Sequence, residues 1–166
     1  MIEFVKAKGI EIFAVKSDYE YQVMPINSLF ADKLTTLGPE TIGIQDERMD
    51  EQIKQFYDIW MLTKYHFCEF KIDEINKKYI MRAEQECENR ARNYDLDEIK
   101  ADVKRQIYRF SFADSGEDIE LKRRINDFNS LYLNSKVDFN PQIVACGASI
   151  VRIVYETILE GEGWDD

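Results

Sequence analysis

The chain has 166 residues, of which 45% are hydrophobic and 13% aromatic, and its 32 acidic and 22 basic residues give a net charge of −10. This length and composition fit one domain or a small two-part unit with a hydrophobic core, and they exclude a globally disordered chain. A dedicated nucleic-acid-binding protein is a poor match, because phosphate contacts need clustered lysine and arginine.

Two short runs near the N-terminus, Ile10–Val15 and Tyr21–Ile26, are rich in β-branched and aromatic residues. The intervening Ser17-Asp18 is turn-prone, so we predict a β-hairpin within residues 1–26. Both faces of the first predicted strand carry apolar side chains, and such an edge strand pairs readily with another chain. We therefore expect a homo-oligomer joined through the N-terminal hairpin.

The remaining residues, 27–166, are expected to form a bundle of helices, because apolar residues recur there with helical spacing. The predicted helices, in chain order, run from Asn27 or Ser28 to Gly38, from about Glu47 to Phe67, from Asp73 to about Asn93, from Asp95 or Asp97 through Phe110, from Ile119 to Tyr132, and from Pro141 onward. The predicted fold class is therefore α+β: an N-terminal β-hairpin, interpreted as the remnant of a larger sheet, followed by a mostly helical bundle.

The most apolar stretch, Ile143–Leu159, is interrupted by Arg152 and Glu156. We interpret it as a core helix and expect no membrane span. The small residues at 145–149 suit close packing against a neighbouring helix. The three cysteines are far apart and odd in number, which favours a reducing, cytoplasmic location.

Charged residues gather on one face of the predicted second helix. With about 100° of rotation per residue, three acids lie within about 60° of Lys54: Glu47, Glu51 and Asp58. On the first helix, Lys33 lies one position off the apolar stripe, so its stem can follow the core edge while its ammonium reaches a cleft and a triphosphate. Spacing alone leaves another interpretation open, a solvated surface with an ordinary Lys54–Asp58 pair.

The segment from Met24 to Leu62 carries a motif in two halves. The first half stands as Ala31-Asp32-Lys33-Leu34-Thr35-Thr36-Leu37, and the second as Arg48 followed by Lys54-Gln55-Phe56-Tyr57-Asp58-Ile59-Trp60-Met61-Leu62. This order is similar to the C-terminal signature of the AbiEii/AbiGii toxin family of nucleotidyltransferases, in which a lysine-bearing helix precedes an arginine and the pattern [KR]-D-x-x-D. The family-like segment lies within residues 27–67 of the predicted bundle.

The resemblance implies a toxin with a polymerase-β-like core that transfers a nucleotide from an NTP with Mg²⁺, in some members to the acceptor end of tRNA. It implies that Lys33 contacts the nucleotide phosphates and that Asp58 is the catalytic acid carried by the second helix. Arg48 and Lys54 are then supporting cations that help to bind the nucleotide. The family's toxin–antitoxin and phage-defence systems imply an antitoxin protein as a partner.

Two departures from the family pattern bear on activity. Gln55 stands where the family has the first acid of its D-x-x-D pair, and nothing before Met24 supplies the family's Gly-Ser turn and Asp-x-Asp strand. Two-metal phosphoryl transfer needs carboxylates of that kind. We therefore expect the chain to be the C-terminal portion of a nucleotidyltransferase that is inactive alone. The alternative is a non-catalytic helical module that binds a protein partner, or a truncated gene product.

Basic residues also gather in the later helices, where acids such as Asp102 lie among them. This mixture indicates a solvated helix surface. An RNA-contacting face is the alternative, because aromatic residues such as Tyr79 and Tyr108 are interleaved with the cations.

Overall fold

The structure is a computed structural model that describes residues 24–133 and 138–160. Within these residues the chain is helical and contains no strand. The elements are α1 (Ile26–Thr35), the short 3-10 helix η1 (Asp46–Arg48), α2 (Met49–His66), the short 3-10 helix η2 (Phe67–Glu69), α3 (Ile72–Asn89), α4 (Leu96–Ser111), α5 (Ile119–Tyr132) and α6 (Pro141–Glu160). The expected α+β fold is therefore wrong, and the described part of the protein is all-α.

The end of the predicted hairpin shows why the β prediction failed. Ile26, expected to close the second strand, is the first residue of α1, and Pro25 precedes it with φ −54° and ψ 144°. Proline cannot donate a backbone hydrogen bond to a sheet, but its fixed φ suits the start of a helix. The rest of the predicted hairpin, and the oligomer contact expected through it, fall on residues 1–23, outside the described residues.

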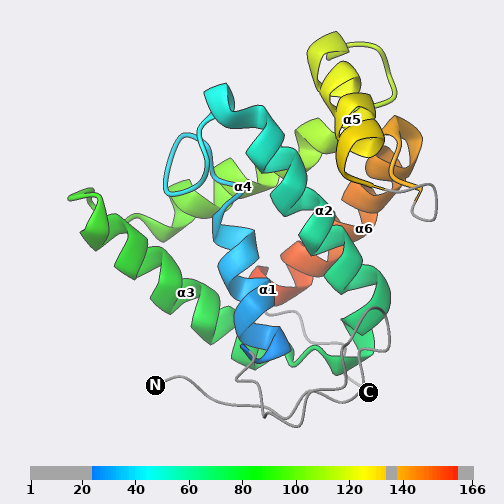
Figure 1. The fold of residues 1–166 in the computed structure, drawn as a ribbon. Helices are drawn as coiled ribbons and strands as arrows, with labels where there is room; N and C mark the ends of the chain where they lie inside the picture. The colour runs from blue at the N-terminus through cyan, green and yellow to red at the C-terminus, as the bar shows by residue number, and fades with distance from the viewer. Residues whose placement is uncertain (1–23, 134–137, 161–166) are drawn as a thin grey trace, which may run out of the picture.

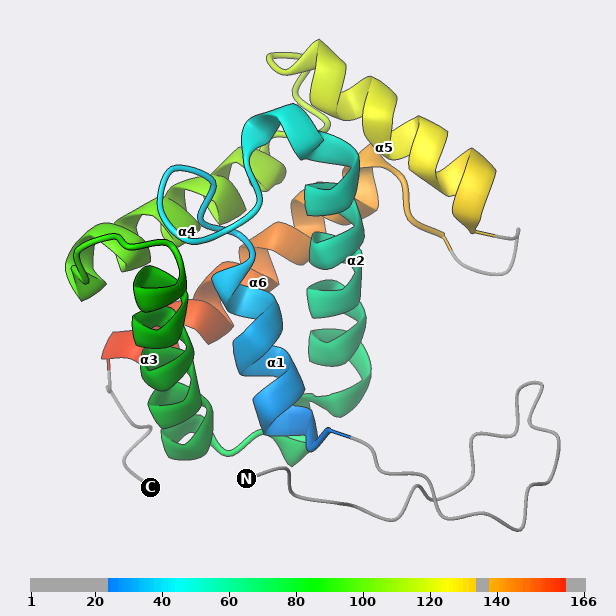
Figure 2. The ribbon, with the colours of Figure 1, turned by 60° about the vertical axis from the view of Figure 1, so that its left-hand side comes forward.

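Helix α1 lies between α2 and α3, while α6 runs along α4 and crosses behind α1 (Figures 1 and 2). The closest associations are those of α1 with α3 and of α4 with α6. One continuous core joins all six α-helices; its largest fully buried members include Tyr79, Phe30, Phe56, Phe110 and Phe139. Helix α5 is peripheral and packs mainly on α2.

The helix boundaries follow recognisable local chemistry. The carboxylate of Asp95 accepts hydrogen bonds from the backbone N–H groups of Asp97 and Glu98, which confirms Asp95 as a predicted cap of α4. Pro141 opens α6 as predicted. The start of α1 differs, because Asn27 is buried in the helix instead of capping it. Its side chain tethers α1 to α3 through Glu74 and the backbone N–H of Lys71.

Helix α6 is the one described helix long and apolar enough to cross a membrane by length and composition, over Pro141–Leu159. Its buried face, which includes Val144, Ala148 and Val151, packs into the core. A Cβ added at Gly147 would lie 2.9 Å from the indole of Trp60, so this close approach to α2 requires glycine. The expected close packing of the small residues is thus confirmed at Gly147, and burial accounts for much of the helix's apolar character.

Candidate functional site

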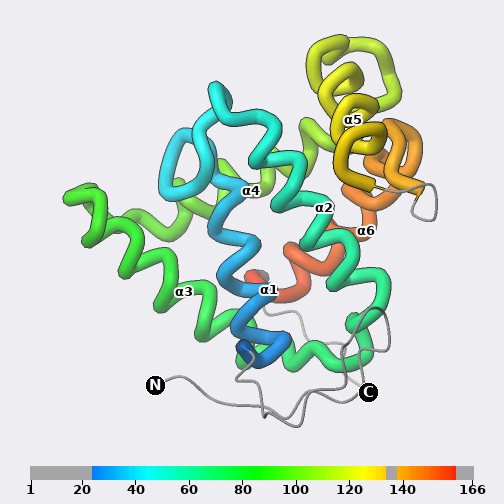
Figure 3. The backbone as a smooth tube through the Cα atoms, viewed as in Figure 1, coloured from blue at the N-terminus to red at the C-terminus, as the bar shows by residue number. Residues whose placement is uncertain are grey.

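The α1–α2 connection (residues 36–45) turns the chain so that α2 returns beside α1, as the backbone tube shows (Figure 3). Two backbone hydrogen bonds close the turn, from the N–H of Gly43 to the carbonyl of Gly38 at 2.6 Å and from the N–H of Ile44 to that of Thr36 at 2.9 Å. A Cβ at Gly43 would lie 2.4 Å from the backbone nitrogen of Gly38. Glycine is therefore needed at position 43, where the end of the turn lies against the backbone of Gly38.

This arrangement brings the two halves of the motif together. The ammonium Nζ of Lys33 on α1 lies 2.7 Å from Oδ2 of Asp58 and 2.7 Å from Oε1 of Gln55, both on α2. Asp58 and Gln55 are one helical turn apart, so they present two acceptors on the same side of α2. The side chain of Lys33 is 21% exposed and that of Asp58 is 33% exposed.

The packing of both helices explains this position. Helix α1 buries Phe30 and Leu34, and α2 buries Phe56 and Ile59, so the charged side chains sit at the edge of the core. An ammonium group has three N–H donors. Two are directed to Asp58 and Gln55, and the third has no acceptor among the described residues.

The other two predicted site residues do not join this cluster. Arg48 is exposed and forms a two-bond ion pair with Glu51, one turn away at the start of α2. Lys54 is also exposed and makes no ion pair among the described residues; the predicted Lys54–Asp58 pair is replaced by Lys33–Asp58. The catalytic role of Asp58 and the nucleotide-binding roles of Lys33, Arg48 and Lys54 stay predictions.

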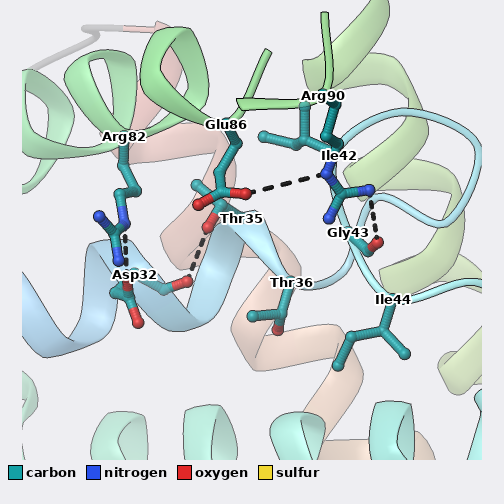
Figure 4. A pocket seen from close by; sticks show the side chains of 9 residues that line it. All are labelled: Asp32, Thr35, Thr36, Ile42, Gly43, Ile44, Arg82, Glu86 and Arg90. Carbon is teal, nitrogen blue, oxygen red and sulfur yellow. Dashed lines mark hydrogen bonds and ion pairs between the residues drawn. The ribbon is translucent and has the colours of Figure 1, made fainter. Parts of the chain in front are cut away.

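A pocket of about 180 Å³ lies on another side of α1, between α1, the α1–α2 connection and α3 (Figure 4). Neither Lys33 nor Asp58 lines it. Its charged groups are already paired: Arg82 with Asp32 at 2.7 Å and Arg90 with Glu86 at 3.8 Å. Both cations that line the pocket are therefore paired with acids, as Lys33 is with Asp58.

The donor set around Lys33 bears on the Mg²⁺ that the resemblance implies. Asp58 is already neutralised by Lys33, and Gln55 contributes an amide in place of a second carboxylate. Among the described residues, no three or more His, Cys, Asp or Glu side chains gather so that they could hold a metal ion. Mg²⁺ prefers several oxygen ligands that include carboxylates. The described part of the site therefore does not fit Mg²⁺ by itself.

Sequence analysis missed a buried polar network on α4. Asp102 was expected on a solvated surface, but it is 1% exposed, and Gln52 and Gln106 are buried beside it at 0% and 4%. The signal in the sequence is the placement of Asp102 and Gln106 inside the apolar stripe of α4, each directly before a buried aliphatic residue.

Comparison with known proteins identifies the family. Residues 6–133, well over half of the chain, match the family model described as the nucleotidyl transferase AbiEii toxin of type IV toxin–antitoxin systems. The chain belongs to the AbiEii family. The match includes α1 to α5, and α6 lies beyond it. No curated protein and no solved structure matches the chain.

Membership confirms the resemblance that the motif indicated, and it establishes a nucleotidyltransferase-like toxin domain. Lys33 and Asp58, the two residues that the motif singled out, lie on separate helices within the matched region and are in direct contact.

Proposed function

We propose that this chain supplies the nucleotide-binding side of an AbiEii nucleotidyltransferase, with Lys33 as the phosphate contact and Asp58 as the acid on the facing helix. The observation that carries the proposal is the ammonium of Lys33, which bridges to both acceptors of the D-x-x-D position, Gln55 and Asp58. A lysine held in place by fixed acceptors presents its remaining N–H donor to a phosphate oxygen in a preorganised position.

Arg48 and Lys54 support the nucleotide from the outer face of α2. Lys54 has no ion pair among the described residues, so its charge is available to a ligand, whereas Arg48 would have to leave Glu51. Lys54 therefore contributes more than Arg48. Both contributions are smaller than that of Lys33, because exposed cations are screened by water and salt.

We propose tRNA as the nucleotide acceptor, an antitoxin as the protein partner, and a cytoplasmic role in phage defence. These assignments rest on the family and on its toxin–antitoxin setting. The basic residues of the later helices give tRNA little support. Most of them are engaged by acids, as Arg109 is by Asp118 and Arg124 by Asp50. The tRNA would therefore contact another surface of the assembled toxin.

Binding of ATP and CTP to the purified chain, measured by titration calorimetry, tests the site. We expect Lys33→Ala to weaken binding about tenfold to a hundredfold, since a hydrogen bond to a charged group contributes about 1.5–3 kcal/mol. Lys77→Ala is the matched control, because Lys77 is an exposed lysine of α3 without an ion pair in the described chain. Equal affinity of the wild type and Lys33→Ala would refute the assignment.

We also expect the chain by itself to transfer no nucleotide, because the donor set around Lys33 does not fit the metal that this chemistry needs. Incubation with labelled NTPs, Mg²⁺ and bulk tRNA measures transfer directly. A labelled product that disappears with Asp58→Ala would contradict this expectation and would show that Asp58 acts with acids we have not identified.

A further inference from the structure

The buried carboxylate of Asp102, on α4, is bonded almost entirely to the α1–α2 connection. Its Oδ2 accepts hydrogen bonds from the backbone N–H groups of Glu40 and Thr41, each at 2.9 Å, and from the hydroxyl of Thr41 at 2.8 Å. Its Oδ1 accepts from Arg105 at 2.7 Å. A buried carboxylate is retained only when its acceptors are satisfied in this way.

Two buried glutamines, Gln106 on α4 and Gln52 on α2, form a second set of hydrogen bonds one turn further along α4. The amide of Gln106 donates to Oε1 of Gln52 at 2.9 Å, and the amide of Gln52 donates to the carbonyl of Ile44 at 2.7 Å and to Asp46 at 3.0 Å. Asp102 thus holds the middle of the connection, and Gln106 holds its end through a residue of α2. Figures 1 and 2 both show the connection lying against α4.

These contacts bear on the site because the connection sets how α1 and α2 lie against each other. Lys33 is three residues before Thr36, where the connection begins, and Gln55 is one turn after Gln52, where the network ends. Lys33 must reach its two acceptors from the other helix within hydrogen-bond distance. A shift of about 1 Å between the helices would break both bonds, because hydrogen bonds weaken steeply outside their normal range.

We propose that Asp102 is a positioning residue for Lys33: by fixing the α1–α2 connection, it sets the contact of the Lys33 ammonium with Gln55 and Asp58. Asp102 does not touch the proposed nucleotide site; it acts through Thr41 and the backbone of the connection. The consequence for nucleotide binding rests on the proposed function. The effect on the Lys33 contact does not.

Thr41 offers a mild way to test this role. Thr41→Val keeps the shape of the side chain but removes the hydroxyl that donates to Asp102, and Thr41→Ser keeps the hydroxyl. Asp102→Ala is the stronger change, because it removes the carboxylate oxygen that accepts all three hydrogen bonds from the connection. Ile125→Val is the control for general loss of stability, since Ile125 is buried on α5, a helix that packs on α2 and α6.

The readout is the ammonium signal of Lys33 in a ¹⁵N–¹H correlation spectrum, assigned by its loss in Lys33→Ala. Hydrogen-bonded ammonium groups give such signals because their protons exchange slowly with water. We expect Thr41→Val and Asp102→Ala to shift or abolish this signal, and Thr41→Ser and Ile125→Val to leave it in place. In parallel, we expect Thr41→Val to weaken ATP binding about tenfold and Thr41→Ser to restore it.

Each result has a definite meaning. An unchanged Lys33 signal in both Thr41→Val and Asp102→Ala would overturn the positioning role, whatever the nucleotide affinities. A shifted signal in Ile125→Val would also overturn it, because the contact would then follow overall stability. Wild-type protein that shows the signal but binds no ATP would refute the proposed function and leave the positioning role standing.

Discussion

Two neighbouring residues of α1, Asp32 and Lys33, form similar clusters with different helices, α3 and α2. Lys33 contacts an acid and a glutamine of α2, namely Asp58 and Gln55. Across α1, Arg82 of α3 contacts the acid Asp32 of α1 and the glutamine Gln85 of its own helix, at 2.7 and 3.0 Å. Each cluster therefore has one cation, one carboxylate and one amide.

Contact geometry alone does not distinguish the proposed functional site from the cluster around Arg82. Both ion pairs measure 2.7 Å, and the acids are about equally exposed, at 33% for Asp58 and 32% for Asp32. The two clusters differ in two ways: Lys33 and Asp58 stand in the order of the family motif, and the acceptors come from different helices. Lys33 takes both acceptors from the facing helix, whereas Arg82 takes its amide from its own helix. The cluster of Lys33 therefore joins two helices through every contact.

The largest difference is expected when a negative charge is added at the glutamine of each cluster. Gln55→Glu places a second carboxylate beside the ammonium proposed to meet the nucleotide phosphates. We expect it to weaken ATP binding, measured without Mg²⁺, about threefold to tenfold, because like charges a few ångströms apart repel in a partly hydrated site. Gln85→Glu adds the same charge beside Arg82 and should leave ATP binding unchanged.

Titration calorimetry of both variants measures the contrast, and their circular dichroism shows whether the fold is retained. Equal losses of affinity in Gln55→Glu and Gln85→Glu would show that the overall negative charge, and not the Lys33 cluster, controls binding. Equal affinity of both variants and the wild type would place the nucleotide elsewhere on the protein.

Much of the helical architecture could be predicted from local sequence, because periodicity and capping are local properties. Asp95 and Pro141 marked helix starts that the structure confirms. The hairpin prediction was wrong at Pro25 and Ile26, because the β-branched composition was given more weight than the proline. Local patterns compete at such positions, and a proline that fits the first turn of a helix decides between them.

The site could be predicted in part. The family resemblance singled out both Lys33 and Asp58, whereas spacing paired Asp58 with Lys54. The contact of Lys33 with Asp58 follows from the way α1 and α2 pack. The place of Asp102 in the apolar stripe of α4 indicates burial, but its partners could not be assigned, because they are backbone groups of a connection far away in the sequence. A local pattern can indicate that an acid is buried, but it does not identify the groups that satisfy its carboxylate.

The smallest expected effects concern stability, and they test whether the two ion pairs also differ energetically. Double-mutant cycles on thermal or urea unfolding, with alanine at each position, measure the coupling of Lys33 with Asp58 and of Arg82 with Asp32. Partly exposed pairs contribute about 0.2–1 kcal/mol, because water screens the charges and the side chains lose entropy. We expect the coupling of Lys33 with Asp58 to lie in the upper half of that range, and that of Arg82 with Asp32 in the lower half.

The exposed fractions of the two cations explain why we expect the stronger coupling for Lys33 with Asp58. The side chain of Lys33 is 21% exposed, against 41% for Arg82, so less water competes for the ammonium. The Lys33 pair also spans two helices together with Gln55, which limits the entropy lost on pairing. A coupling of Arg82 with Asp32 equal to or larger than that of Lys33 with Asp58 would contradict this argument. It would mean that the two-pronged guanidinium geometry outweighs burial on this side of α1.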